Sequence, residues 1–362
     1  MTKLRLGMVG GGPGAFIGPV HGIAARLDDR FTLSAGAFSR DAAKNRQAGE
    51  GYGLPADRVY ASWQEMLAQE KGRLDLIAIV TPNDTHFPIA KAALQADFNV
   101  LCDKPATLNL EEALRLRGIV RASGKAYGLT YTYSGYPLVR EARKLVVEGR
   151  IGRVRKIVVE YSQGWLSQEL RNKQADWRAD PAQSGLGGCI ADIGVHAFHL
   201  SEFVSGAKVE SLCADLGTVV PGRALDDDCN VLLHYENDVR GVLVSSQIAA
   251  GDRNGLRLRV YGEKGGIDWS QEQPNTLTIN AHDAPTQVLH AGTPYLTYGA
   301  RVPAGHPEGY LEAFATLYRD FAGQISTGAP SLVPGIDDGV RGMAFIETAI
   351  RSSRNKSWET LL

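Results

Sequence analysis

The first 130 residues alternate between two patterns of apolar and polar positions. Short, nearly continuous apolar runs predict five strands, at residues 4–10, 31–38, 74–80, 98–102 and 126–130. Segments with helical periodicity separate them, and two of these begin with N-cap signals, Ser62 with Glu65 and Asn109 with Glu112. Because strands that alternate with helices form parallel sheets covered on both faces, we expect residues 1–133 to form an α/β domain.

From about residue 151 the strand patterns follow one another directly, at residues 154–163, 209–217, 228–236, 239–250, 256–269 and 275–279. Asn237–Asp238 and Gly265–Gly266 are turn pairs that would join neighbouring strands. Helical patterns appear at residues 189–204, 307–325 and 337–353. We therefore expect residues 134–362 to form an α+β domain with a large, open, mostly antiparallel sheet. One face would pack on these helices, and the other would hold a second copy of the chain, giving a homodimer or homotetramer.

Composition narrows the class of protein. Of the 362 residues, 44% are hydrophobic and 22% are charged, as in ordinary soluble globular proteins. The net charge of −1 indicates no basic surface for nucleic acids or membranes, and no apolar run reaches membrane-spanning length. Cys102, Cys189, Cys213 and Cys229 lack the spacing of a zinc ribbon or a disulfide framework. We expect a cytoplasmic protein with reduced thiols, whose partners are small molecules rather than nucleic acids or membranes.

A glycine cluster follows the first predicted strand. Gly10 and Gly12 allow a tight turn and a close approach to a pyrophosphate, and the next helix offers unpaired N–H groups. The spacing differs from G-x-G-x-x-G, because the third glycine, Gly18, lies six residues after Gly12 and the loop has about three extra residues. In its place after the first strand of an α/β pattern, the cluster predicts a dinucleotide-binding Rossmann domain. The expected loop contacts are Gly10, Gly12, Pro13, Gly14, Ala15, Phe16 and Ile17.

The end of the second predicted strand bears on the choice of cofactor. An acidic residue at this position would bind the adenosine ribose and favour NAD. Here Ser39 and Arg40 occupy the position, and a hydroxyl and a guanidinium suit a 2′-phosphate. Asp41 follows them and could serve the ribose or begin the next helix. The sequence therefore favours NADP over NAD.

Two places carry side chains suited to proton transfer. Lys104 directly follows a buried strand, where its ammonium could stabilise an oxyanion, although surface lysines also occur at strand ends. Asp192 and His196 lie four residues apart on one face of a predicted helix. A neutral imidazole can accept the proton of an alcohol, and Asp192 could orient it or bind a substrate hydroxyl; equally, the two could be a helix-start carboxylate and a core histidine. Asp192, His196 and His199 could also hold a metal, but without an HExxH arrangement we expect none.

Together these motifs resemble the Gfo/Idh/MocA family of NAD(P)-dependent oxidoreductases, which includes glucose-fructose oxidoreductase and inositol dehydrogenase. The resemblance covers nearly the whole chain and includes, after the glycine loop, "TPNDTH", "CDKP", "DWRADPAQSGLGGCIADIGVHAFHL" and "VYGEKGGID". "CDKP" is similar to the family's E-K-P motif, with Asp103 in place of the glutamate. The resemblance implies a Rossmann domain followed by a domain with a large open sheet. It also implies that Lys104, Asp192 and His196 form the catalytic set in a cleft between the domains.

The resemblance and the strand-end positions suggest further contacts. For the cofactor these are Ser39, Arg40, Thr81, Pro82, Asn83, His86, Asp103, Lys104, Trp177 and Arg178. For the substrate they are Lys104, Tyr131, Tyr133, Tyr161, Asp176, Arg178, Asp192, His196, Arg301 and His306.

The function expected from this resemblance is hydride transfer between a nicotinamide and a secondary alcohol or ketone of a sugar, polyol or inositol. His196 would take the hydroxyl proton while Lys104 steadies the oxygen. Three other functions stay open: a glycoside hydrolase or lyase that uses transient oxidation by tightly bound NAD, a non-catalytic nucleotide-binding sensor, and a metal-dependent hydrolase.

Overall fold

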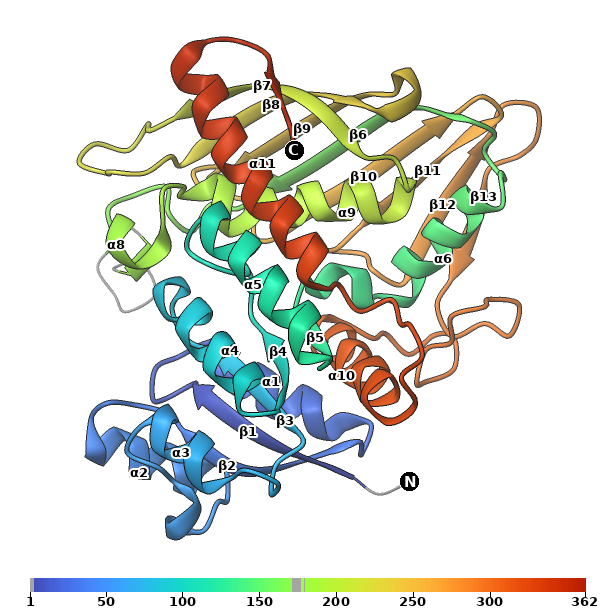
Figure 1. The fold of residues 1–362 in the computed structure, drawn as a ribbon. Coiled ribbons are helices and arrows are strands. Elements are labelled where there is room, and N and C mark those ends of the chain that lie inside the picture. Colours follow the sequence, from blue (N-terminus) through green and yellow to red (C-terminus); the bar gives the residue numbers. More distant parts are fainter. Residues whose placement is uncertain (1–2, 171–176, 179) are drawn as a thin grey trace.

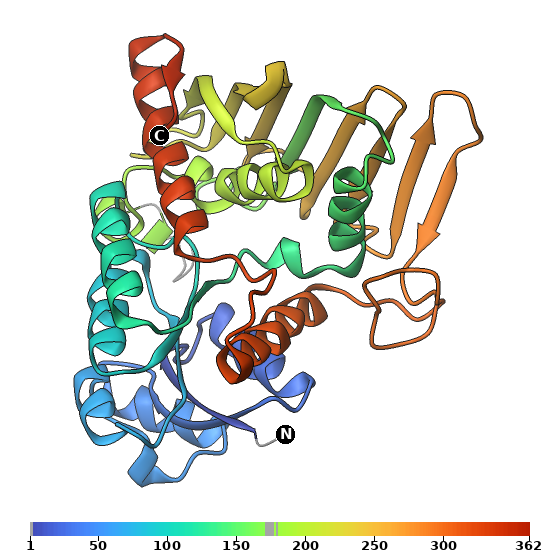
Figure 2. The same ribbon diagram turned by 45° about the vertical axis from the view of Figure 1, so that its right-hand side comes forward.

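The computed structural model describes residues 3–170, 177–178 and 180–362, which form two β-sheets with helices between and around them (Figures 1 and 2). The first sheet comes from the N-terminal third of the chain and is drawn in blue to green in Figure 1. The second sheet comes mainly from the middle of the chain. The architecture is therefore a Rossmann-like α/β domain joined to a second domain with a mostly antiparallel sheet, as the sequence predicts.

The first sheet is parallel, with strand order β2-β1-β3-β4-β5. Its strands are β1 Leu4–Gly10, β2 Phe31–Ala37, β3 Leu76–Val80, β4 Asn99–Cys102 and β5 Tyr127–Leu129. Helices cover both faces, so the central strand β3 is apolar at every position: Leu76 and Ala78 pack in one cluster of core residues, and Ile77 and Ile79 in another. This burial on both faces explains the continuous apolar runs of the sequence.

The helices of the first domain are α1 Ile17–Leu27, α2 Ala42–Gly51, α3 Trp63–Gln69, α4 His86–Gln95 and α5 Leu110–Ser123. Two of them, α3 and α5, begin at the predicted caps. The Ser62 side chain accepts a hydrogen bond from the backbone N–H of Glu65 (3.1 Å), and Asn109 does the same for Glu112 (2.9 Å). Both predicted N-caps are confirmed, and each satisfies a donor that the first helical turn leaves unpaired.

The carboxyl ends of β1 and β3 mark the point at which the chain changes direction in the sheet. The connection after β1 runs to β2 on one side, whereas β3 lies on the other side of β1. Ligands bind at such switch points in open α/β sheets. Gly18, in the first turn of α1, allows that helix to pack against the loop, because a Cβ there would lie 2.3 Å from the Cα of Gly11.

The second sheet has nine strands in the order β13-β12-β11-β10-β6-β9-β8-β7-β14. β6 and β9 run parallel, and the other neighbouring strands are antiparallel. Alternate side chains of β6 are buried, which is the pattern of a sheet with one packed face. The strands are β6 Val154–Ser162, β7 Val209–Gly217, β8 Asp228–Tyr235, β9 Arg240–Ser246, β10 Gly255–Gly262, β11 Gly265–Ser270, β12 Thr276–Ala281, β13 Gln287–His290 and β14 Glu359–Thr360.

One predicted turn of this sheet is confirmed and one is wrong. Asn237 and Asp238 both have positive φ (58° and 61°) and join β8 to the antiparallel β9. Gly265 and Gly266 instead lie inside β11, so the turn precedes them. Here glycine is required by close packing, since a Cβ at Gly265 would lie 2.4 Å from the carbonyl oxygen of Asn280 on β12.

Helices of the second domain cover one face of this sheet (Figure 2). They include α6 Pro137–Val147, the π-helix Ile190–Gly194 that leads into α9 Val195–Ser205, and α11 Ile336–Asn355. The short α8 Pro181–Ser184 instead packs against residues 83–85 of the first domain, where Asn83 Nδ2 donates to the Ser184 carbonyl (2.9 Å). The sequence did not predict α6 or the edge strands β13 and β14. The sequence does not identify α6 as a core-facing helix because its buried face carries charges. Arg140 is 4% exposed, donates to the Ser134 carbonyl (2.9 Å) and pairs with Asp320.

Helix α10, Tyr310–Thr327, belongs to the late part of the chain but packs on the first domain beside α1. The buried His21 ring of α1 lies 2.7 Å from the Tyr318 hydroxyl of α10, and Phe314 adds an edge contact to the same ring. The predicted boundary at residue 133 therefore separates α1 from a helix that covers it.

Among the described residues, no helix combines the length and the apolar character needed to cross a membrane.

The close contact at Gly18 gives a test of the loop. We expect Gly18→Ala to lower the free energy of unfolding by about 1–3 kcal/mol, because the new methyl group would overlap the Gly11 backbone. Gly118→Ala is the matched control: Gly118 lies in α5 with open space around it, so alanine there should raise stability by about 0.5–1 kcal/mol. Urea unfolding of the two variants measures both effects, and a stabilised Gly18→Ala variant would contradict the close packing.

Candidate active site

A cavity of about 1110 Å³ lies where the carboxyl ends of β1, β3 and β4 face the second domain. Small-molecule pockets occupy about 300–1,000 Å³, so this cavity is slightly larger than that range. Its wall from the first domain includes the glycine loop and the ends of the parallel strands. Its wall from the second domain includes Gln163, Asp192, His196 and Asn254. A smaller cavity of about 520 Å³ adjoins it and shares Lys104 and Asp192.

The glycine loop fits a pyrophosphate. Gly10 has φ 91°, and a Cβ at Gly12 would lie 2.7 Å from the Phe38 carbonyl, so both positions require glycine. α1 starts directly after the loop and has no side-chain cap, which leaves its first N–H groups available to an anion. The expected residues Gly10, Gly12, Ala15, Phe16 and Ile17 line the cavity, whereas Pro13 and Gly14 lie in a turn and do not line it.

The end of β2 presents Ser39 and Arg40 to the same cavity. Arg40 is exposed. Asp41 has another role, because its carboxylate accepts from the backbone N–H of Lys44 (2.9 Å) and caps α2. The Ser39 hydroxyl in turn accepts from the backbone N–H of Asp41 (3.1 Å). At this edge the structure therefore offers a guanidinium to a ligand, and the neighbouring carboxylate is engaged by the backbone.

Lys104 is held at the boundary between the two domains. It follows β4, and its backbone N–H donates to the Asp103 carboxylate (2.9 Å), which also accepts from the Thr130 hydroxyl (2.7 Å). The Lys104–Pro105 peptide bond is cis. Lys104 Nζ reaches across to Asp192, donating to its carbonyl oxygen (2.5 Å) and to Oδ1 (3.0 Å). An ammonium has three N–H donors, so one remains for an atom in the cavity.

Asp192 is an ionised carboxylate with three partners. Lys104 binds Oδ1, while Oδ2 accepts from Arg178 Nε (3.1 Å) and from Gln247 Nε2 (2.9 Å). Burial by itself raises the pKa of the Asp192 carboxyl, but the charges of Arg178 and Lys104 outweigh it and hold the pKa well below its ordinary value. The guanidinium of Arg178 also lies over the Trp177 ring at 4.3 Å, which helps to fix it.

His196 lies beside Asp192, but the carboxylate does not orient its ring. Within the described residues no hydrogen bond joins the two side chains, and the buried His196 Nδ1 has no hydrogen-bond partner. The segment from Ile190 to Gly194 is a π-helix, which differs from the expected α-helix. Burial, reinforced by the charge of Lys104, lowers the pKa of the imidazole well below its ordinary value. His196 is therefore neutral and can accept a proton.

A hydrogen-bonded set of polar side chains surrounds His196. The Tyr133 ring packs edge-on against the imidazole at 5.0 Å, and its hydroxyl bonds to that of Tyr161. Tyr161 donates to Asn254 Oδ1 (2.7 Å), which also accepts from Gln163 Nε2 (2.8 Å). All four side chains line the cavity. Such donors and acceptors suit a ligand with several hydroxyl groups.

The sequence predicted the two tyrosines of this set but missed Gln163, Asn254 and Gln247. One signal was available: Gln163 directly follows β6 in "YSQ", and Gln247 directly follows β9 in "SSQ". β6 and β9 are parallel neighbours with Ser162 opposite Ser246, so both glutamines lie at one edge of the sheet.

Several predicted contacts lie away from the cavity. Tyr131 is buried against His199, with ring centroids 4.3 Å apart. Arg301 pairs with Asp28 at the end of α1 (Nε to Oδ1 2.8 Å), and the exposed His306 contacts the Pro303 carbonyl. None of these three predicted substrate contacts lines the cavity.

Two other predicted contacts have different outcomes. His86 is fully buried, and its ring nitrogens lie 2.8 Å from the Pro105 carbonyl and 2.9 Å from that of Thr81. It therefore ties together the two loops that carry the predicted cofactor contacts instead of lining the cavity. Asp176 lies outside the described residues.

The remaining predicted contacts do line the cavity. They are Ser39, Arg40, Thr81, Pro82, Asn83, Asp103, Lys104, Tyr133, Tyr161, Trp177, Arg178, Asp192 and His196.

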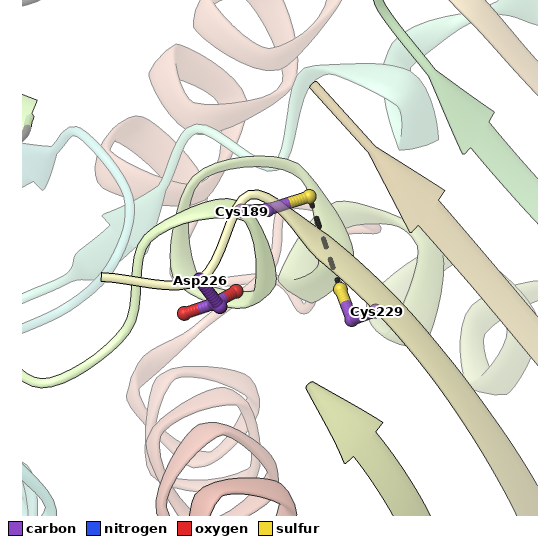
Figure 3. Close-up of side chains that lie close together, drawn as sticks. All are labelled: Cys189, Asp226 and Cys229. Carbon is purple, nitrogen blue, oxygen red and sulfur yellow. Dashed lines mark hydrogen bonds between the residues drawn. The ribbon is translucent and has the colours of Figure 1, made fainter. Parts of the chain in front are cut away.

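Among the described residues, the group with metal-ligand spacing is Cys189, Asp226 and Cys229 (Figure 3). It is not the Asp192, His196 and His199 set considered above. The two sulfur atoms face each other at 3.8 Å. Both Asp226 oxygens already accept from backbone N–H groups, those of Gly188 (2.6 Å) and Ile190 (2.7 Å). Burial raises the pKa of the Cys189 thiol, which disfavours the thiolate that metals require.

Two family models match this chain, one in the N-terminal part and one in the C-terminal part. Residues 4–131 match the oxidoreductase family with an NAD-binding Rossmann fold, and residues 139–268 match the GFO/IDH/MocA C-terminal domain. An uncharacterized oxidoreductase of Bacillus subtilis (strain 168) is 35% identical, over 98% of this chain and 95% of the relative.

Solved structures of similar proteins belong to the same family of folds. The inositol dehydrogenase homolog from Azotobacter vinelandii complexed with NAD⁺ has a TM-score of 0.95 and 34% identity, covering 99% of this chain and 97% of that one. The same homolog complexed with NADH and myo-inositol has a TM-score of 0.92 and 33% identity, covering 99% and 98%. With both domain models matched and relatives above 30% identity along almost its full length, this chain belongs to the Gfo/Idh/MocA family of NAD-binding oxidoreductases.

Proposed function

We propose that the chain transfers hydride between a nicotinamide dinucleotide and a secondary alcohol or ketone of a sugar, polyol or inositol. One observation carries the proposal: Lys104, Asp192 and His196 meet in the cavity that the glycine loop also lines. A bound nicotinamide dinucleotide supplies the hydride acceptor or donor.

Lys104, Asp192 and His196 have different roles in alcohol oxidation. His196 is neutral, so it can take the proton from the substrate hydroxyl. The third N–H of Lys104 would hold the same oxygen and stabilise the negative charge that develops on it. Asp192 holds the ammonium in place through two hydrogen bonds. In ketone reduction the same groups act in reverse.

The substrate class is supported by the polar wall and by a relative. Gln163, Asn254 and Tyr161 present donors and acceptors near His196, as a polyhydroxylated ring requires. The Azotobacter homolog was solved with myo-inositol. The pocket therefore suits a cyclic sugar or polyol more than an apolar alcohol.

We propose NADP as the preferred cofactor. Arg40 is exposed at the cavity edge, where a 2′-phosphate would need a cation, and Asp41 is occupied as a helix cap. The relatives were solved with NAD⁺ and NADH, so the preference rests on Arg40 and Asp41 alone.

We also propose a homodimer or homotetramer that forms through the outer face of the nine-stranded sheet, in the cytoplasm. That face carries exposed Leu232, Tyr261 and Val288, and it pairs Arg257 with Asp268 on neighbouring strands. Sedimentation of the purified chain would test the oligomer. The free thiols suit a reducing compartment.

The catalytic assignment is tested by Lys104→Met and His196→Asn. Each should lower kcat for polyol oxidation by at least ~100-fold, because the oxyanion donor or the proton acceptor is lost. The nucleotide dissociation constant should change little. Lys71→Met, on an exposed lysine that does not line the cavity, is the control. Full activity in both variants would refute the assignment, and tight nucleotide binding without turnover of any polyol would favour a sensor.

The cofactor preference is tested by titration with NADPH and NADH, followed by nicotinamide fluorescence. We expect tighter binding of NADPH, and Arg40→Ser should weaken it by roughly 10-fold or more while leaving NADH nearly unchanged. Arg46→Ser, on the exposed side of α2, is the matched control. If the wild type binds NADH more tightly and Arg40→Ser has no effect, the site recognises the unphosphorylated ribose of NAD and the proposed NADP preference is wrong.

The pH dependence follows from the lowered pKa of His196. A general base must be unprotonated, so kcat/KM for oxidation falls when the pH drops through its pKa in the free enzyme. Because burial lowers this pKa below its usual value of about 6.5, the acid limb should lie below pH 6.5. A kcat/KM profile from pH 5 to 9 measures it. An acid limb above pH 6.5 would mean that a different group accepts the proton.

A further inference from the structure

Gln247 connects the second sheet to the catalytic carboxylate. Its amide Nε2 donates to Asp192 Oδ2 at 2.9 Å. It directly follows β9, and its side chain is almost fully buried, at 3% exposure. Among the three partners of the carboxylate, Lys104 belongs to the first domain and Arg178 to the segment that precedes α8, so Gln247 is the partner carried by the sheet itself.

The backbone of Gln247 is fixed from two sides. Its N–H donates to the Asp227 carbonyl (2.9 Å), and its carbonyl accepts from the Leu166 N–H (3.1 Å). The residue before it, Ser246, is the last residue of β9 and pairs with Ser162 of β6. An amide held this way has little freedom, so it can set the orientation of the carboxylate it binds.

A neutral donor suits this position. Lys104 and Arg178 already place two positive charges on the single negative charge of Asp192. A third cation would leave more positive charge than the carboxylate can balance, and a carboxylate would repel it at close range. A shorter or apolar side chain would leave one lone pair of a buried anion without its donor, which is costly.

We propose that Gln247 is a positioning residue for the hydride-transfer reaction: by fixing Asp192 Oδ2 it sets the direction of Oδ1, and so the place of the Lys104 ammonium in the cavity. This inference rests on the proposed function. The chain of contacts is short, from Gln247 Nε2 to Oδ2, and from Oδ1 to Lys104 Nζ at 3.0 Å. A displacement of about 1 Å at the reacting oxygen can cost ~100-fold in rate.

The experiment compares Gln247→Met with Gln247→Glu in the full-length enzyme, using a polyol that the wild type oxidises. Gln247→Met keeps the volume but removes the donor, so kcat should fall by roughly 10- to 100-fold at every pH. The KM for the nucleotide should stay within about two-fold, because Gln247 does not line the larger cavity.

Gln247→Glu provides a readout that a purely structural role would not move. Below its pKa the new carboxyl is neutral and can donate to Asp192 as the amide does; above it, two carboxylates face each other. The ratio of the variant's kcat to the wild-type kcat should therefore rise toward the acid end of a profile from pH 5 to 9. Dividing by the wild-type value removes the contribution of His196.

Controls separate the possible failures. Gln324→Met and Gln324→Glu, on α10 where the side chain accepts from Ser331, should leave kcat unchanged. If the wild type oxidises a polyol but Gln247→Met keeps kcat within two-fold, or the Gln247→Glu ratio is flat with pH, the positioning role is refuted while the proposed function stands. If Gln247→Met does not fold, the Gln247→Glu ratio alone decides. If the wild type turns over no alcohol, both proposals fail.

Discussion

The contact between Lys104 and Asp192 is the constraint on which the arrangement of the two domains depends. A buried carboxylate is unfavourable unless it is paired and hydrogen-bonded. Arg178 and Gln247 cover Oδ2 of Asp192, but Oδ1 gains its partner, Lys104, only where the end of β4 in the first sheet comes within reach of the π-helix that lies on the second. The Lys104–Asp192 contact therefore fixes the position of the two sheets relative to each other. Because the cavity lies between the sheets, its shape is fixed as well.

The sequence predicted the fold well because the burial of each strand determines its pattern of apolar and polar residues. Strands covered on both faces must be apolar throughout, as at residues 76–80, and half-covered strands must alternate, as in β6. Single residues also identify helix starts and turns. Ser62 and Asn109 cap helices, and Asn237 accepts a positive φ that most residues avoid. Lys104, Asp192 and His196 could be named together because each stands in a recognisable motif.

What the sequence did not predict depends on contacts between distant segments. Nothing local distinguishes Arg301, which pairs with Asp28, from an arginine that binds substrate. Gln247 gains its role only from the parallel pairing of β6 and β9, a choice that alternating strand patterns leave open. The π-helix is similar: its sequence fits an α-helix, and one additional residue per turn changes which groups face the cavity.

The packing of α10 on α1 has a consequence for synthesis of the chain. The face of the parallel sheet that carries Leu6, Ala78 and Leu101 is completed by Phe314 and Phe321, which are translated about 200 residues after the last strand of that sheet. A ribosome adds roughly 5–20 residues per second, so for ten seconds or more the nascent first domain presents an unfinished apolar face. The first domain can therefore be completed only after α10 has been made, and until then its exposed apolar face favours aggregation.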